Sequence, residues 1–358
     1  MFFPSLGRRK SPIGVVIGAG LIAVFSPAVI GAAAVAAPNV VTTIKPVHSI
    51  VAAVMDGVAT PELLIDGAAS PHSFALKPSQ AFKLQGADLV FWIGESLETS
   101  LAKPMASLPA TARVIELADT PGLELLPFRE LSEFGEDDHD HEGEEDHADH
   151  AADENGTHEH EHDDDHAHDQ ERESAAGHDG HDHHGSFDPH LWLDPDNAVV
   201  MAMAISEALS KADPGNAATY AENAQGFRER VEKLAADVDS QLAGVRGKPF
   251  VVFHDAYHYF EKKFDIPAAG AISINPESPS SAEHVREIRE TITEKGVVCV
   301  FSEPQFEPKL IQVVTEGTQV RSGVLDPLGT AYANGPELYE SLIKGAADAI
   351  TSCLASNG

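Results

Sequence analysis

The chain has 358 residues, and 42% of them are hydrophobic, which is enough to form the cores of two or three domains. Lys and Arg total 24 against 57 Asp and Glu, so the formal net charge is -33. Nucleic acids and anionic membrane surfaces are bound by clustered basic residues, so this balance argues against both and favours cations as ligands.

Residues 1–36 have the layout of a secretory signal peptide. A basic stretch, Arg8–Lys10, precedes an uncharged apolar run over Ile13–Ile30, and Ala34–Ala36 supplies an A-x-A cleavage site. A transmembrane anchor is the alternative, but glycines and Pro27 interrupt the run. We therefore expect cleavage, export to the periplasm and no stable insertion in the membrane.

Short β-rich runs alternate with helical patterns along the rest of the chain, which predicts an α/β protein with mainly parallel sheets. Four such runs fall in each half, so we expect two similar lobes of about four strands each. The expected strands are Val40–Ile44, Glu62–Ile65, Ala87–Ile93, Ala112–Leu117, Phe250–Phe253, Ala271–Ile274, Val297–Phe301 and Val320–Leu325.

The composition changes abruptly over residues 133–185, which hold 22 acidic residues and 13 histidines but almost no large apolar side chains. Such a segment buries too little apolar surface to offset the conformational entropy lost on ordering, so we expect a disordered insertion. Its imidazole and carboxylate groups are expected to bind divalent metal loosely. The alternative is a solubilising linker that binds metal only because it is rich in histidine. The auxiliary metal-binding residues are His139, His141, His147, His150, His158, His160, His162, His166, His168, His178, His181, His183 and His184.

A long helix is predicted between the two lobes. Asp213-Pro214 is a helix start, and apolar residues then recur at steps of three or four from Tyr220 to Val245, a stripe over about 30 residues. A coiled coil is the alternative, but a spine joining two lobes suits an α/β chain better. The predicted organisation is a signal peptide (1–36), an N-terminal lobe (37–132 plus 186–212), the His-rich loop (133–185), the linking helix (213–246) and a C-terminal lobe (247–358).

The two cysteines, Cys299 and Cys353, are too far apart for a CxxC motif. In an oxidising compartment they can pair and join the C-terminal helix to a core strand. The closed loop of about 55 residues would contribute roughly 4 kcal/mol in the chain-entropy model. Two buried free thiols are the alternative.

Three histidines outside the loop each lie where a predicted strand or turn passes into a loop. They are His72 in Ser70-Pro71-His72, His190 in Asp188-Pro189-His190, and His254 directly after the strand Phe250–Phe253. Ligands of open α/β sheets bind beyond the carboxyl ends of the strands, and three neutral imidazoles can hold zinc with a fourth position open. A hydrogen-bonded structural role is the alternative for each histidine.

Four other residues are weaker candidates. His258 lies four residues after His254, and we expect it on the surface. His48 is a candidate to line the cleft, His284 is expected to be solvated, and Glu303 is a candidate to support a ligand from behind.

Five motifs occur along the chain at Gly67–Phe74, Asp188–Pro195, Val252–Tyr257, Ser302–Phe306 and Leu325–Gly329. Together, and in this order, they resemble the periplasmic solute-binding proteins of zinc-uptake ABC transporters. The resemblance covers nearly all of the mature chain, and a His-rich insertion just before Asp-Pro-His is typical of the zinc members. It implies two lobes joined by a rigid helix, with metal bound between them.

The resemblance also implies a ligand set. The family's metal histidines fall on His72, His190 and His254, and the third histidine favours zinc, because manganese and iron relatives tend to carry a carboxylate there. The family's acidic position falls on Asp326, whereas the acidic residue that some zinc members carry before the first histidine is replaced by Pro71. The fourth ligand is therefore Asp326 or water. The family's disulfide falls on the two cysteines.

The leading prediction is a monomeric binding protein, not an enzyme, that carries Zn²⁺ as its transported ligand and delivers it to the membrane subunit of an ABC permease. One alternative is a zinc buffer that acts through the loop 133–185. A less favoured alternative is a three-histidine zinc enzyme, since no His-Glu-x-x-His motif is present. A nickel- or manganese-specific binder is a variant of the leading prediction.

Overall fold

The computed structural model describes residue 14 and residues 36–129, 187–273 and 280–355. The chain divides into two units, Met1–Ala36 and Ala37–Gly358, and the second unit holds all of the elements below. Among the helices described, none is both long enough and apolar enough to cross a membrane. The predicted signal peptide, except Gly14 and Ala36, and the loop 133–185 lie outside the described residues.

The first sheet contains four parallel strands in the order β2-β1-β3-β4. Its inner strands β1 and β3 are completely buried, as their runs of β-branched and aromatic residues predict. The sequence prediction of four strands in this half is confirmed, although each is shorter than expected. The strands are β1 (Val40–Thr42), β2 (Glu62–Leu63), β3 (Leu89–Trp92) and β4 (Arg113–Glu116).

The second sheet repeats this arrangement with the order β6-β5-β7-β8, again all parallel. In both sheets the chain starts on an inner strand, passes to one edge and then crosses to the other side. The carboxyl ends of the two inner strands are therefore a switch point, where ligands of such sheets bind. The strands are β5 (Phe250–His254), β6 (Gly270–Ser273), β7 (Cys299–Ser302) and β8 (Arg321–Val324).

Parallel strands need crossover connections, and short helices supply most of them. In the first half these are α1 (Lys45–Val54), α2 (Pro78–Gln85), the 3₁₀ turn η1 (Thr99–Leu101) and α3 (Ala102–Ser107), and the turn η2 (Leu117–Asp119) follows β4. In the second half they are α6 (His258–Phe264), α7 (Ala282–Glu294) and α8 (Lys309–Thr315).

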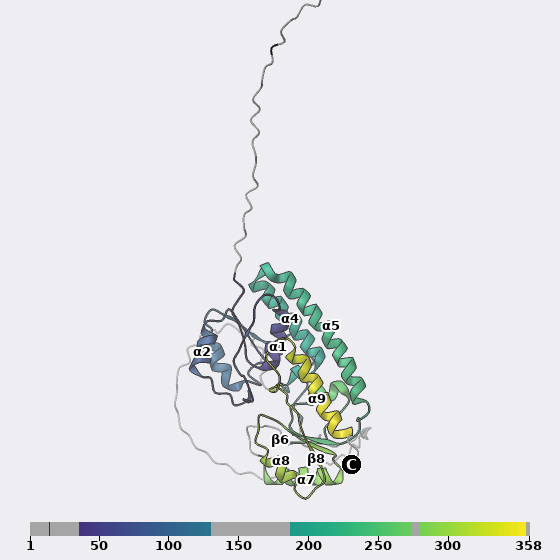
Figure 1. Cartoon of the computed structure of the whole chain (residues 1–358). Coiled ribbons are helices and arrows are strands. Elements are labelled where there is room, and N and C mark those ends of the chain that lie inside the picture. Colours follow the sequence, from purple (N-terminus) through teal and green to yellow (C-terminus); the bar gives the residue numbers. More distant parts are fainter. Residues whose placement is uncertain (1–13, 15–35, 130–186, 274–279, 356–358) are drawn as a thin grey trace, which may run out of the picture. The chain divides into compact units, whose positions relative to one another are not determined.

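Three longer helices, α4 (Pro195–Ala212), α5 (Ala217–Leu242) and α9 (Leu338–Ala355), run side by side (Figure 1). A 3₁₀ turn, η5 (Pro214–Asn216), leads into α5. The predicted apolar stripe is the buried face of α5, and its last member, Val245, is buried just beyond the end of the helix.

One hydrophobic core contains residues of both halves of the chain. Tyr339 of α9 packs against Phe227 of α5, with ring centroids 5.6 Å apart, and its hydroxyl donates to the carbonyl of Trp192 (2.9 Å). The predicted disulfide is present: Cys299 of β7 and Cys353 of α9 are bonded, with Cα atoms 6.2 Å apart. It joins the C-terminal helix to the second sheet, as the sequence analysis expected.

Candidate metal centre

His254 is the last residue of β5, where it is buried and leaves the sheet at the switch point. The parallel register pairs Phe250 with Cys299 on β7, and the same offset places Glu303 beside His254. The Nδ1 atom of His254 lies 2.7 Å from Oε1 of Glu303. A carboxylate accepts only, so Nδ1 carries a proton and Nε2 lies on the side of the ring away from Glu303.

His190 precedes the 3₁₀ turn η4 (Leu191–Leu193). The carboxylate of Asp188, two residues earlier, accepts from the backbone N–H of His190 (3.0 Å) and lies 2.7 Å from its Nδ1. The ring of His190 rests against Trp192 (centroids 5.4 Å apart), whose indole N–H donates to the carbonyl of Pro327 (2.8 Å). His190 is therefore oriented by a carboxylate in the same way as His254.

His72 lies in the loop between β2 and α2. The loop turns at Gly67, whose φ of +73° is a conformation that favours glycine. Ser100 donates to the carbonyl of Phe74 (2.6 Å), which ties the loop to the segment that follows β3. The Nε2 atom of His72 is buried and has no hydrogen-bond partner among the described residues.

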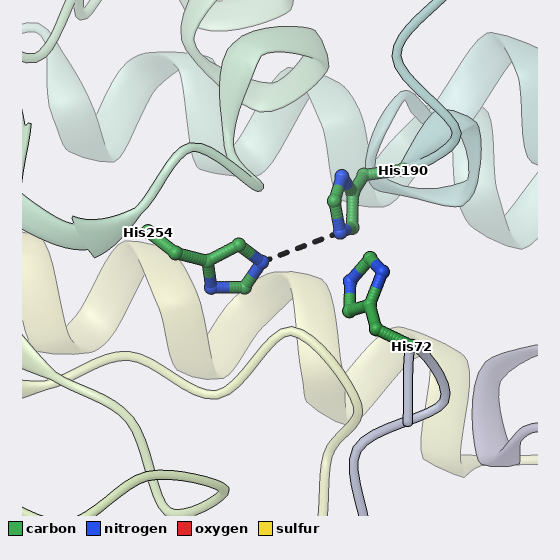
Figure 2. Close-up of side chains that lie close together, drawn as sticks. All are labelled: His72, His190 and His254. Carbon is green, nitrogen blue, oxygen red and sulfur yellow. Dashed lines mark hydrogen bonds between the residues drawn. The ribbon is translucent and has the colours of Figure 1, made fainter. Parts of the chain in front are cut away.

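The three imidazole rings converge on one point (Figure 2). One ligand atom from each lies within 4.8 Å of the others, and the ring centroids are 5.2–5.9 Å apart. The Nε2 atoms of His190 and His254 are 3.3 Å apart. Nitrogen ligands about 2.0–2.1 Å from a tetrahedral zinc ion are about 3.3–3.4 Å from one another, so this pair already has the required spacing.

Burial and the close approach of the rings keep two of the imidazoles neutral. Burial, reinforced by the neighbouring histidines, lowers the pKa of His72 to about 2, and burial lowers the pKa of His190 well below its usual range. Burial also lowers the pKa of His254, but the charge and hydrogen bond of Glu303 outweigh it, so the pKa is raised. His72 and His190 are therefore neutral and available as ligands, whereas the carboxylate beside His254 favours a positive charge there. His254 is thus the residue at which a proton competes with a metal ion.

A cavity of about 10 Å³ adjoins the three histidines, which is room for one water-sized group. Its other walls include Trp192, Phe306 and Gln305. The edge of His254 also faces the ring of Phe306 (centroids 5.6 Å apart). The space is small and mainly apolar, so it suits a single ion with its bound ligand and not an organic substrate.

Asp326, predicted as the alternative to water for the fourth ligand, is not in the three-histidine group. Its carboxylate accepts five hydrogen bonds, from the Gln305 amide and from groups in the turn that follows Asp326. The carboxylate thus organises the turn at the end of the second sheet.

The remaining histidines that the structure describes lie elsewhere. His48 is buried in α1 with its Nε2 atom 3.2 Å from the carbonyl of Pro61. His284 was expected to be solvated, but its Nε2 atom lies 2.9 Å from the carbonyl of Ala271. His258 was expected on the surface but is only partly exposed, because it begins the packed helix α6. The thirteen loop histidines fall outside the described residues.

The sequence analysis missed one charged group beside the centre. Arg129 donates through Nε to both oxygens of Asp255 (3.1 Å each) and through Nη1 to Glu261 (2.6 Å). Asp255 directly follows His254, and Tyr259 of the same helix as Glu261 donates to the carbonyl of Asp188 (2.8 Å). These bonds hold the segments of His190 and His254 together. Neither residue type nor spacing signals a pairing across more than 120 positions.

Comparison with known proteins shows the family to which the chain belongs. The family model described as zinc-uptake complex component A, periplasmic (ZnuA), matches residues 40–353. The chain belongs to this family. Its fold is also that of a solved ZnuA crystal structure, with a TM-score of 0.68 at 20% identity over 89% of this chain and 99% of that one.

Relatives in the family carry the same printed description. The high-affinity zinc uptake system protein ZnuA of Brucella abortus (strain 2308) is 45% identical over 88% of this chain and 91% of its own length. The protein of that name from Yersinia pestis is 36% identical over 89% of this chain and 92% of its own length. A periplasmic zinc-binding protein from Treponema pallidum has the same fold, with a TM-score of 0.68 at 20% identity over 89% of this chain and all of that one.

Proposed function

We propose that this protein captures Zn²⁺ in the periplasm through His72, His190 and His254 and delivers it to the membrane subunit of an ABC permease. One observation carries the proposal: three imidazoles from three separate segments converge, and two of their Nε2 atoms have the spacing of ligands on one tetrahedral ion. Membership of a periplasmic zinc-uptake family supports the same conclusion.

The ligand chemistry favours zinc over other divalent ions. The group consists of histidines alone, and neutral imidazole suits zinc, whereas manganese prefers carboxylate and carbonyl oxygen. Imidazole also binds nickel and copper, but Cu(II) and Ni(II) favour square-planar or tetragonal arrangements. The 3.3 Å separation of two nitrogens matches tetrahedral geometry, so we expect zinc to be preferred to nickel.

A role in transport requires binding and release without chemistry on the ion. The carboxylates of Asp188 and Glu303 each face the Nδ1 atom of a ligand, where they orient it. No observation favours the enzyme alternative. We further propose that residues 1–36 are the cleaved export signal, which N-terminal sequencing of the exported protein would test.

The decisive experiment is zinc affinity by chelator competition, with and without residues 133–185, so that loop binding does not hide the proposed site. We expect one tight site in both forms. Replacement of His72, His190 or His254 by Ala should weaken it by on the order of 100-fold or more, since loss of an orienting partner alone costs about 10–100-fold.

His284→Ala is the matched control, because this histidine lies in the same part of the fold but outside the group. It should leave the affinity unchanged. If the tight site disappears when residues 133–185 are removed, the loop binds the metal and the zinc-buffer alternative is correct. Equal affinities in the three alanine variants and the parent would also reject the proposed site.

A further inference from the structure

His72 is held differently from the other two histidines of the centre. His190 and His254 each have a carboxylate against Nδ1, whereas the ring of His72 has no carboxylate partner among the described residues. His72 comes from a loop of the first half of the chain, and His254 comes from the second sheet (Figure 2). The position of His72 relative to its partners therefore depends on contacts between its loop and the rest of the molecule.

The segment 326–334, which we call the bridging segment, adjoins the metal centre. Its Pro327 lines the cavity beside the three histidines, and the carbonyl of Pro327 accepts from the indole N–H of Trp192 (2.8 Å). The carboxylate of Asp326 accepts from both the N–H and the hydroxyl of Thr330. The segment is therefore folded on itself and bound to a residue that packs against one of the ligands.

Tyr332 attaches the bridging segment to helix α9. Its hydroxyl lies so close to Gly345 of α9 that no Cβ atom would fit there without a shift of the ring. Glycine is unfavourable in the interior of a helix, so the close approach of Tyr332 gives a physical reason for Gly345. The bridging segment is thus fixed to the metal centre at one end and to the helical layer at the other.

Lys45 of the first half is bound to the bridging segment. The residue is buried at the start of α1, shortly after β1 ends. Its ammonium group donates to the carbonyls of Tyr332 (2.8 Å) and Thr330 (3.3 Å). A buried lysine is normally paired with a carboxylate, but none of the described carboxylates forms an ion pair with Lys45. The two carbonyls are therefore its partners, and they join the two halves of the chain.

Asp66 makes a second connection, at the start of the loop that carries His72. Its Oδ1 atom accepts from the side-chain amide of Asn334 (3.2 Å) and from the N–H of Gly67 (2.8 Å). The hydrogen bond from Asn334 lowers the pKa of Asp66, and the charge of Lys45 does so to a smaller extent, so the two residues are neighbours. The first half is therefore attached to the bridging segment at two adjacent points, one of them in the loop itself.

We propose that Lys45 and Asp66 are positioning residues for His72. By attaching the loop to the bridging segment they hold His72 against the other two histidines, and their separation from the segment lets His72 withdraw and the ion leave. This inference rests on the proposed function. A direct effect of charge predicts the opposite sign for the lysine, because removal of a positive charge near a divalent cation strengthens binding, whereas loss of positioning weakens it.

Zinc affinity and the zinc dissociation rate of the full chain, both measured with a competing chelator, test the inference. Lys45→Met should weaken binding by about tenfold and speed dissociation, since loss of a group that orients a ligand costs about 10–100-fold. Asp66→Ala, at an exposed position where folding is not at risk, should weaken binding by a smaller factor, and Asp66→Asn keeps the acceptor and should restore most of the affinity. The controls are Lys103→Met and Asp56→Ala, at exposed positions of the first half, which should change neither quantity.

The variant His72→Ala shows whether the effect passes through His72. In that background Lys45→Met and Asp66→Ala should each change the affinity by less than about twofold, because the group that they position is gone. Tighter binding by Lys45→Met, affinities of both single variants equal to that of the parent, or effects of the same size with and without His72 would overturn the inference and leave the proposed function intact. Absence of a tight zinc site in the parent would overturn both.

Discussion

Glu98 is a carboxyl group buried in the first half of the chain. It has no exposed surface, accepts a hydrogen bond from the hydroxyl of Thr43, and accepts another from the N–H of Gly94 (3.0 Å). Burial raises its pKa to about 7, although these hydrogen bonds favour the charged form. The folded protein therefore holds this proton more tightly than the unfolded chain does.

The sign of the pH effect follows directly. The contribution of Glu98 to stability is complete below its ordinary pKa of 4.5 and is lost progressively as the pH rises to about 7. Each pH unit in this window costs about 1.4 kcal/mol, so the total loss is about 3 kcal/mol. Glu98→Gln removes the ionisation, so relative to the parent the variant should gain about 3 kcal/mol of unfolding free energy between about pH 4.5 and about pH 8.

The assay is urea unfolding of parent and variant, with a chelator present, at several pH values across this window. Changes in hydrogen bonding to Thr43 and Gly94 add an offset that is the same at every pH, so only the trend carries the prediction. Glu95→Gln, at an exposed neighbouring position, is the control and should show no trend. A constant difference between parent and Glu98→Gln across the window would refute the reasoning.

Three further predictions concern the metal centre and its support. Arg129→Met should lower the free energy of unfolding, measured with urea, by about 3–5 kcal/mol and weaken zinc binding, because it leaves two buried carboxylates unpaired. Lys262→Met, which breaks an exposed ion pair, is the control and should lower the free energy of unfolding by less than about 1 kcal/mol. Zinc affinity, measured by chelator competition at fixed ionic strength, should fall about tenfold for each pH unit below the raised pKa of His254. An affinity that does not change with pH would contradict the role of His254 as a ligand. Replacing Cys299 and Cys353 by Ser should lower the free energy of unfolding by about 4 kcal/mol in the chain-entropy model, and an unchanged urea midpoint would show that the bond contributes nothing.

The sequence predicted the parts of the fold that depend on local patterns. All eight strands occur where the β-rich runs lie, and the stripe from Tyr220 gave the position of α5. Residue type and position after a strand or turn made the three histidines candidates, the family resemblance implied them as the ligand set, and the structure brings them together. These features are visible in sequence because period, strand composition and the chemistry of imidazole belong to the residues themselves.

The tertiary structure alone decided how distant segments meet. Glu303 faces His254 because the register of two parallel strands places them side by side, and a sequence does not state a register. Asp326 was a candidate ligand by position, yet its carboxylate bonds to the turn and to Gln305. Arg129 pairs with acids more than 120 positions away because packing brings their segments together. The sequence by itself thus singled out the three histidines as candidates, whereas the folded chain determined that they meet and which carboxylates lie against their Nδ1 atoms.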